Sequence, residues 1–223
     1  RIFGLLDTPV KITSPASDAS RQIEGPGRIE FDHVWFAYRD NEYVIRDVSF
    51  FVDPGERVGI VGSTGSGKTT LISLLLRFYE VNRGRILIDG VDIRKIPLAN
   101  LRRRFGLVLQ DVFLFSGTIR DNVTLGNTEI TDEHVRKATK NVHAENFIEN
   151  LPNGLDSEVS ERGGKLSVGQ KQLLSFARAL AFEPDVLILD EATSSVDTET
   201  EILVRDALQK LMEGRSTVAV AHR

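Results

Sequence analysis

The sequence predicts an α/β fold, and three observations carry this prediction. Short runs of β-forming residues alternate with stretches of helical period along most of the chain. One such run, RVGIVG at residues 57–62, leads directly into a glycine-rich turn and a helical pattern. Two later runs, VLILD at 186–190 and TVAVA at 217–221, are apolar at nearly every position, as strands buried on both faces are. Together these features favour a sheet covered by helices.

The expected elements follow in order after a linker. Residues 7–27 are rich in Asp, Thr, Pro, Ser and Gly, so residues 1–27 are predicted to form a linker and the folded domain to begin near Arg28. Thr131 is expected to cap a helix that has two acids in its first turn. Strands are expected at 28–38, 48–52, 57–62, 85–90, 185–191 and 217–221, and helices at 68–79, within 97–165, and at 167–182 and 198–212.

Composition excludes several classes of protein. With 223 residues, 41% hydrophobic and 27% charged, the chain can bury a substantial core, which excludes disorder. A net charge of -4 without long like-charged blocks excludes a surface built to coat nucleic acid. The absence of cysteine excludes disulfides, thiolate catalysis and cysteine-ligated metals. No apolar run approaches the roughly 18 residues of a membrane span, and the first residues do not form a signal peptide.

Residues 62–69, GSTGSGKT, match the phosphate-binding pattern G-x-x-x-x-G-K-[ST]. In such a loop, backbone N–H groups and a helix N-terminus surround an anion. Lys68 would reach the β and γ phosphates, and the Thr69 hydroxyl would bind Mg²⁺. The alternative is a glycine-rich turn that binds nothing, but the flanking strand and helix favour a P-loop. The predicted phosphate-binding residues are Gly62, Ser63, Thr64, Gly65, Ser66, Gly67, Lys68, Thr69 and Thr70.

The apolar strand VLILDE ends in two carboxylates at a position where α/β sheets bind ligands. Asp190 fits the coordination shell of Mg²⁺. Glu191 would project toward the γ phosphate, where it could polarise or deprotonate the attacking water. The alternative is a solvated acidic turn, which the P-loop upstream makes the weaker interpretation.

The order of these motifs resembles the nucleotide-binding domain of ATP-binding cassette (ABC) transporters, over residues 28–223. LSVGQ at 166–170 resembles the family signature LSGGQ, and S-x-x-Q is also a helix capping box, so both interpretations can hold. The resemblance implies a P-loop NTPase core with a mixed sheet, an N-terminal antiparallel β subdomain and an inserted helical subdomain at about residues 97–180. It also implies that Ser167, Gly169 and Gln170 face a γ phosphate bound by a second domain.

Four further positions match the family only through this resemblance. Tyr38 would stack on adenine, although a buried strand tyrosine is the alternative. Gln110 would contact Mg²⁺ and water, unless it merely closes a strand. Asp197 would lie at a dimer seam, unless it is a helix cap. His222 would hold the γ phosphate, whereas the other three histidines, His33, His134 and His143, are interpreted as ordinary surface or strand residues.

The resemblance extends to the exporter branch of the family. RIFGLLDTP at the start resembles the end of a last transmembrane helix, and SERGGK at 160–165 resembles a segment that touches the membrane domain through Glu161 and Arg162. The chain is therefore expected to be an excised domain, soluble by itself, at the cytoplasmic face of a bacterial inner membrane. Its expected partners are a transmembrane domain of the same chain and a second nucleotide-binding domain, with no nucleic acid.

Val168 departs from the family signature, which has glycine there. In exporters with unequal halves, one half often keeps the catalytic glutamate but has an altered signature, so a heterodimer is slightly favoured over a homodimer. The predicted function is an ATPase, using ATP and Mg²⁺, that drives export. Three alternatives stay open: a soluble ABC ATPase acting on DNA or ribosomes, a regulatory module with little hydrolysis and, last, a P-loop kinase.

Overall fold

The computed structural model describes residues 12–15, 25–40, 42–160, 163–190 and 198–221. Its backbone divides into two compact units, one formed by residues 1–52 and 64–102 and the other by residues 53–63 and 103–223. None of the helices in the described ranges is long and apolar enough to cross a membrane.

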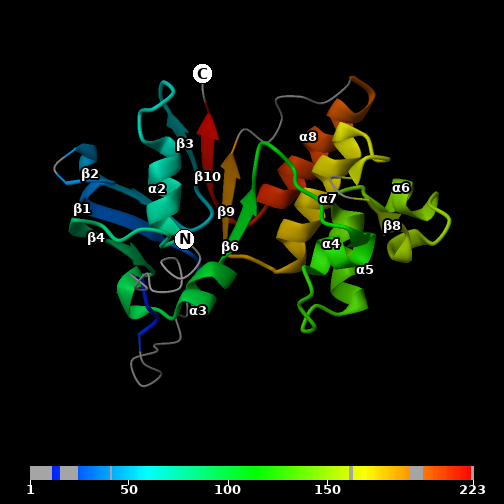
Figure 1. Ribbon diagram of the computed structural model, residues 1–223, viewed down its shortest axis with the longest axis horizontal. Helices are drawn as coiled ribbons and strands as arrows, with labels where there is room; N and C mark the ends of the chain where they lie inside the picture. The colour runs from blue at the N-terminus through cyan, green and yellow to red at the C-terminus, as the bar shows by residue number, and fades with distance from the viewer. Residues whose placement is uncertain (1–11, 16–24, 41, 161–162, 191–197, 222–223) are drawn as a thin grey trace, which may run out of the picture. The chain divides into compact units, whose positions relative to one another are not determined.

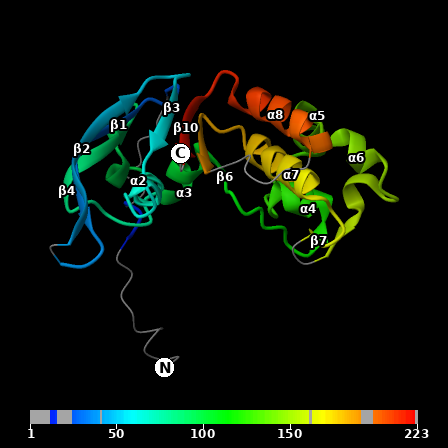
Figure 2. The same ribbon diagram turned by 90° about the horizontal axis from the view of Figure 1, so that it is seen from above.

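The first unit is built on an antiparallel sheet. Its strands, in spatial order, are β2 (Tyr43–Val52), β1 (Ile29–Ala37), β4 (Arg83–Ile88) and β5 (Val91–Asp92). Buried apolar residues such as Ile29, paired with Val52 and Ile88 on the two neighbouring strands, form its core face. Helix α2 (Lys68–Leu75) lies beside this sheet (Figure 2). The short helices η2 (Ile93–Lys95) and α3 (Leu98–Arg103) follow β5.

The second unit contains a parallel sheet. Its strands, in spatial order, are β3 (Arg57–Val61), β10 (Ser216–Ala221), β9 (Val186–Asp190) and β6 (Phe105–Val108) (Figure 1). Val61 pairs with Ala221, and Asp190 pairs with Val220. Because all pairings are parallel, the carboxyl ends of the four strands meet at one edge of the sheet. Antiparallel and parallel strands therefore lie in separate sheets.

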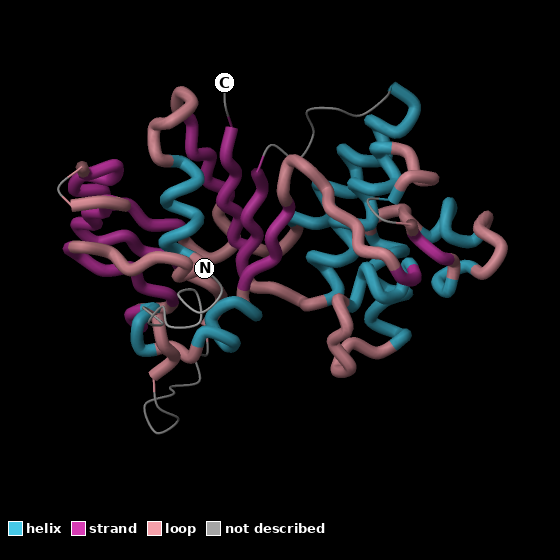
Figure 3. The backbone as a smooth tube through the Cα atoms, in the orientation of Figure 1, coloured by secondary structure: helices cyan, strands magenta, loops and turns pink. Residues whose placement is uncertain are grey.

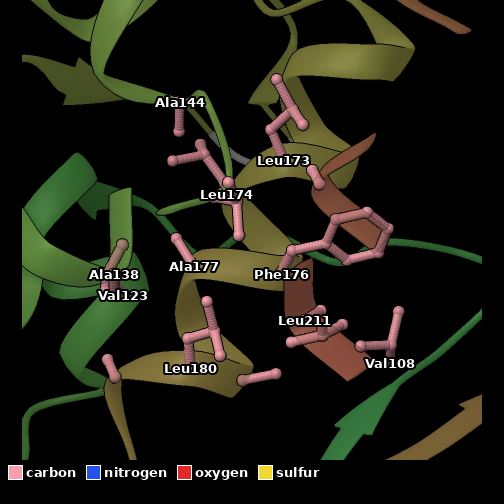
Figure 4. Close-up of a cluster of buried hydrophobic side chains, with 14 of the residues drawn as sticks. Val108, Val123, Ala138, Ala144, Leu173, Leu174, Phe176, Ala177, Leu180 and Leu211 are labelled. Carbon is pink, nitrogen blue, oxygen red and sulfur yellow. The ribbon is translucent and has the colours of Figure 1, made fainter. Parts of the chain in front are cut away.

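The helices of the second unit form a group of their own (Figure 3). They are α4 (Ile119–Thr124), α5 (Asp132–Asn141), α6 (Glu145–Glu149), α7 (Val168–Ala181) and α8 (Thr198–Met212). The short helix η3 (Gly154–Asp156) and a two-stranded antiparallel sheet of β7 (Gly117–Thr118) and β8 (Glu158–Val159) lie among them in the chain. Helix α7 lies at the centre of their core, where the fully buried Phe176 and its neighbours meet Val108 of β6, Val123 of α4 and Leu211 of α8 (Figure 4). This packing fixes the position of α7, which begins at the signature sequence.

Most predicted elements are present. The strand expected at 48–52 begins earlier, at Tyr43, and the helix expected at 68–79 ends earlier. The pattern predicts a helix over 68–79, but α2 ends at Leu75 because Arg77 adopts a left-handed backbone with φ 54°. Phe78 N–H donates to the Ser73 carbonyl and Arg77 N–H to the Leu74 carbonyl, which is a Schellman motif. Apolar residues beyond this point continue the helical pattern in sequence but pack as a turn.

The segment preceding the first strand also makes defined contacts. Ser14 Oγ accepts from the Leu98 N–H at 3.0 Å, so this residue satisfies a donor at the start of α3. The Thr13 carbonyl accepts from the buried Arg77 guanidinium at 3.2 Å. At least residues 12–15 of the expected linker are thus attached to the first unit.

Candidate functional site

The glycine-rich turn before α2 has the backbone that an anion-binding loop needs. Gly65 and Gly67 have φ of +82° and +94°, a left-handed conformation that residues with a Cβ adopt only at a cost. A Cβ on Gly67 would also lie 2.8 Å from Ile45 Cδ1. Gly67 is the N-cap of α2, and no side chain caps this helix within the described residues. A helix N-terminus of this kind can receive an anion.

Lys68 is the first residue of α2 and only 5% exposed. A cation at a helix N-terminus opposes the helix dipole, and the first turn of α2 has no acid to offset it. The position of Lys68 at the helix N-terminus suits a lysine that binds an anion. Thr69 beside it is exposed, while Thr70 is buried on the other side of the helix.

Three predicted site residues lie at one edge of the parallel sheet. Gly62 directly follows β3, the half-buried Asp190 ends β9, and the exposed Gln110 comes two residues after β6. Since the strands are parallel, their carboxyl ends bring these residues to the edge where α/β sheets bind ligands. Glu191 and His222, which follow β9 and β10, lie outside the described residues, as do Asp197, Glu161 and Arg162.

The signature sequence forms the beginning of α7. Ser167 is the N-cap and makes the predicted capping box with Gln170: its Oγ accepts from Gln170 N–H at 3.2 Å, and Gln170 Oε1 accepts from Ser167 N–H at 3.0 Å. The Ser167 hydroxyl accepts in this contact and so keeps its proton for donation. Within the described residues, the N–H groups of Val168 and of the buried Gly169 have no acceptor, because the cap takes that of Gln170. The Val168 side chain is 52% exposed.

Tyr38 lies just after β1 with half of its surface exposed. Its hydroxyl is 3.0 Å from Thr70 Oγ1 on α2, and its ring lies edge to face with Phe36 and Tyr79. The buried-tyrosine alternative does not hold, since the ring is open to a ligand. The sequence patterns do not predict the contact with Thr70, because it joins two elements that are 32 residues apart.

The sequence interpretation misses Arg178. This arginine lies on α7 and donates to the carbonyls of Phe113 and Asn122 at 3.1 and 2.8 Å. Asn122 in turn bonds the backbone of Phe115 in both directions. Burial lowers the pKa of the Arg178 guanidinium. These hydrogen bonds attach the segment after Gln110 to α7, the helix that begins at the signature. The sequence feature that could have identified Arg178 is its charge within the apolar run SFARALAF.

The three described histidines serve the structure in different ways. His33 pairs with Asp47 at 2.7 Å on the exposed sheet, and His134 completes the capping box of Thr131, which confirms Thr131 as the N-cap of α5. His143 forms an ion pair with Asp206 of α8 when it is protonated. A hydrogen bond from His143, followed by one from Lys210, lowers the pKa of the Asp206 carboxyl. The interpretation of the three histidines as ordinary surface or strand residues omits this contact of His143, which connects the segment after α5 to α8.

A pocket of about 360 Å³ lies beside residues 160–165, entirely within the second unit. It is lined on one side by Ser160, Gly163 and Lys165 and on the other by Ile119 and Leu151.

The donor set fits Mg²⁺ bound together with a nucleotide. Mg²⁺ usually binds one or two protein oxygens, phosphate oxygens and water, rather than a cage of side chains. The described residues contain no group of three or more His, Cys, Asp or Glu side chains that could hold a metal by themselves. The Asp190 carboxylate and the Thr69 hydroxyl, the predicted ligands, are each an oxygen donor of the kind that Mg²⁺ prefers.

A phosphate-binding loop before α2, a carboxylate at the end of β9 and an open helix start at LSVGQ define a P-loop ATPase of the ABC type. The sequence matches the ABC transporter family over residues 45–194, and the chain belongs to that family. Members of the family are ATPases, and this chain is an ATP-binding domain of that kind.

Individual relatives support the exporter branch. The fatty acid ABC transporter ATP-binding/permease protein of Mycobacterium tuberculosis is 48% identical over 223 residues, which are 100% of this chain and 35% of that protein. The uncharacterized ABC transporter ATP-binding protein YwjA of Bacillus subtilis is 49% identical over 208 residues, or 93% of this chain and 36% of YwjA. The chain thus spans little more than a third of these curated relatives.

A solved structure of a bacterial Atm1-family ABC exporter with ATP bound has the same fold. It superimposes with a TM-score of 0.88 at 39% identity, covering 100% of this chain and 39% of the exporter chain. The chain is accordingly similar to the nucleotide-binding domain of ABC exporters.

Proposed function

We propose that this domain is the motor of an ABC exporter, which hydrolyses ATP as two such domains close and separate. The observation that carries the proposal is the N-terminus of α2, where a buried lysine follows two left-handed glycines. Left-handed glycines before a helix N-terminus are the features of an anion-binding loop, and the positive charge of Lys68 suits a triphosphate. The relatives that combine an ATP-binding domain with a permease in one protein support the coupling to transport.

Each candidate residue has a defined task in this proposal. Lys68 and the N–H groups of residues 62–70 bind the β and γ phosphates. Thr69 and Asp190 would hold Mg²⁺, which neutralises phosphate charge, and Gln110 would contact the ion and the attacking water. Glu191 accepts a proton from that water, and His222 donates a hydrogen bond to the γ phosphate. Tyr38 stacks against the adenine.

The signature at the start of α7 would act on the nucleotide of a second domain. The Ser167 hydroxyl and the N–H groups of Val168 and Gly169 are hydrogen-bond donors without an acceptor among the described residues. A helix N-terminus with free donors attracts a phosphate. The γ phosphate would therefore hold two domains head to tail, and its loss on hydrolysis would release them. We propose a heterodimer with an unequal second half, slightly in preference to a homodimer, because Val168 replaces a signature glycine.

The membrane side of the proposal rests on a second surface. Glu161 and Arg162 would contact a helical segment of a membrane domain, next to the pocket that Ser160, Gly163 and Lys165 help to line. We propose that this contact holds the domain at the cytoplasmic face of a membrane, such as a bacterial inner membrane. The compound that is transported would be selected by the membrane helices of the whole protein.

Two substitutions in the natural full-length protein test the ATPase. Lys68→Ala should weaken ATP binding at least tenfold, because it removes the charge that contacts the β and γ phosphates. Glu191→Gln should retain ATP binding and lower the steady-state rate of ATP hydrolysis by at least a hundredfold. Binding is measured by calorimetry and hydrolysis by phosphate release.

Retained turnover in Glu191→Gln would remove Glu191 from the mechanism. Tight ATP binding with negligible hydrolysis in the wild-type protein would favour the regulatory module instead, an alternative that the altered signature at Val168 keeps open. A stimulation of hydrolysis by DNA or ribosomes, and none by a reconstituted membrane domain, would favour the soluble ABC ATPase.

A further inference from the structure

The ring of Tyr38 is held by contacts that the proposed function does not use. Its hydroxyl is 3.0 Å from Thr70 Oγ1, and its ring centroid lies 5.0 Å from that of Tyr79 at an interplanar angle of 89°. A second edge contact, with Phe36 at 4.8 Å and 83°, completes the arrangement. All four residues belong to the first unit. Because perpendicular aromatic pairs are electrostatically favourable, these contacts define one orientation of the ring.

Thr70 and Tyr79 connect that ring to the two ends of α2. Thr70 lies two residues after Lys68, at the end of the helix where phosphate is expected to bind. Tyr79 follows the Schellman turn that ends the helix. The turn is joined to β1 through Asn82, whose side-chain oxygen accepts from Ala37 N–H at 2.7 Å and whose N–H donates to the Trp35 carbonyl at 2.9 Å.

The exposure of the pair indicates more than a role in core packing. Tyr38 is 50% exposed and Tyr79 is 44% exposed, so both rings are open to solvent at the edge of the unit. Tyr38 is hydrogen-bonded to α2, the helix that carries the proposed phosphate-binding Lys68. The two half-exposed tyrosine rings form a surface suited to a flat apolar group next to a triphosphate.

We infer that Thr70 and Tyr79 are positioning residues that fix the Tyr38 ring, so that the base and the phosphates of one nucleotide are bound at a set separation. The inference rests on the proposed binding of ATP at this loop. Thr70 ties the hydroxyl of Tyr38 to the first turn of α2, and Tyr79 supports the ring from the turn after α2. Loss of either contact lets the ring rotate, which weakens the binding of the base but leaves the phosphate contacts in place.

The test compares ligands with and without a base, in the natural full-length protein. The dissociation constants of Mg²⁺-ATP and of Mg²⁺-tripolyphosphate are measured by calorimetry, or by competition where the second is weak. Tyr79→Leu should weaken ATP binding about three- to tenfold, the usual effect of losing one aromatic contact, and change tripolyphosphate binding less than twofold. Tyr79→Phe keeps the ring and should bind ATP like the wild type.

The hydrogen bond to Thr70 is tested separately. Tyr38→Phe removes the hydroxyl but keeps the ring, and should weaken ATP binding about threefold. Adding Thr70→Val to Tyr38→Phe should cost less than the two single changes together, since both remove the same bond. The matched control is Tyr43→Leu, because the Tyr43 ring pairs with Trp35 at 5.4 Å instead of with Tyr38.

The outcomes separate this inference from the proposed function. If the wild-type protein binds no ATP, the proposed function fails. If the wild type binds ATP and Tyr79→Leu binds it equally well, the positioning role is wrong. Equal weakening of ATP and tripolyphosphate would show that the substitution distorts the phosphate loop, and an equal effect of Tyr43→Leu would show general destabilisation. Both results would overturn the inference.

Discussion

At the scale of single residues, the backbone of Gly67 shows how the phosphate loop limits its own sequence. A side chain there would meet two obstacles, the left-handed φ of +94° and the Ile45 methyl group 2.8 Å away. The first obstacle costs about 1–2 kcal/mol in the free energy of unfolding. The second requires either the buried Ile45 side chain or the loop to shift, and the proposed phosphate contacts are N–H groups of that loop.

We therefore expect Gly67→Ala to weaken ATP binding at least tenfold. Gly55→Ala is the matched control: Gly55 has φ +76° in the turn before β3, and a Cβ there would contact nothing within 4 Å. Both variants should lose about 1–2 kcal/mol of stability from backbone strain, but only Gly67→Ala should lose affinity. Denaturant unfolding and calorimetry measure the two effects. Normal affinity in Gly67→Ala would mean that α2 does not bind the phosphates.

Residue roles can be predicted from sequence only where the function is local. The P-loop residues are consecutive, so the sequence pattern alone identifies Lys68 and the glycines that precede it. The Tyr38 contact with Thr70 and the attachment of Arg178 to Phe113 join residues 32 and 65 positions apart. No local pattern reports such pairs, since they depend on how distant elements pack.

At the scale of elements, the sequence predicts the capped starts of α5 and α7 but not the end of α2. Thr131 and Ser167 cap α5 and α7 as expected, because the capping box is a pattern of side chains within four residues. The helical pattern, by contrast, continues past the true end of α2. There the left-handed residue is Arg77 instead of glycine, and its guanidinium bonds to Glu80 and to the Thr13 carbonyl help to hold that turn.

The cap of α7 is expected to have two tasks, and a second cap separates them. Ser167→Ala and Thr131→Ala each remove a capping box and should each cost about 1 kcal/mol in the free energy of unfolding. Only Ser167 has a hydroxyl proposed to reach a nucleotide. In the Glu191→Gln background, Ser167→Ala should raise the ATP concentration needed for dimerisation at least fivefold, while Thr131→Ala leaves it unchanged. Light scattering during ATP titration provides the measurement. If both variants raise the ATP concentration for dimerisation equally, Ser167 acts only as a helix cap.

At the scale of the whole molecule, the proposed ATPase needs a second domain, because the signature at the start of α7 is proposed to bind a nucleotide held by that domain. The start of α7 presents unused donors among the described residues, and Val168 projects there with about half of its surface exposed. A β-branched side chain at this place keeps an approaching phosphate farther away than glycine would. We therefore expect the size of the Val168 side chain to decide whether the domain forms an ATP-bound dimer with an identical copy.

Replacing that side chain tests the preference for an unequal partner. In full-length Glu191→Gln, where ATP is bound but not consumed, Val168→Gly should lower the ATP concentration for half-maximal dimerisation about threefold or more, and Val168→Ala should have an intermediate effect. Glycine at an exposed helix start lowers stability by less than about 1 kcal/mol, so Val168→Gly should stay folded. A change in its dimerisation therefore reports on the contact and not on unfolding. If all three proteins dimerise at the same ATP concentration, Val168 does not limit closure, and a homodimer with two equal sites becomes the better hypothesis. If the parent protein stays monomeric while Val168→Gly forms an ATP-dependent dimer, the natural partner must provide the intact signature that this chain lacks.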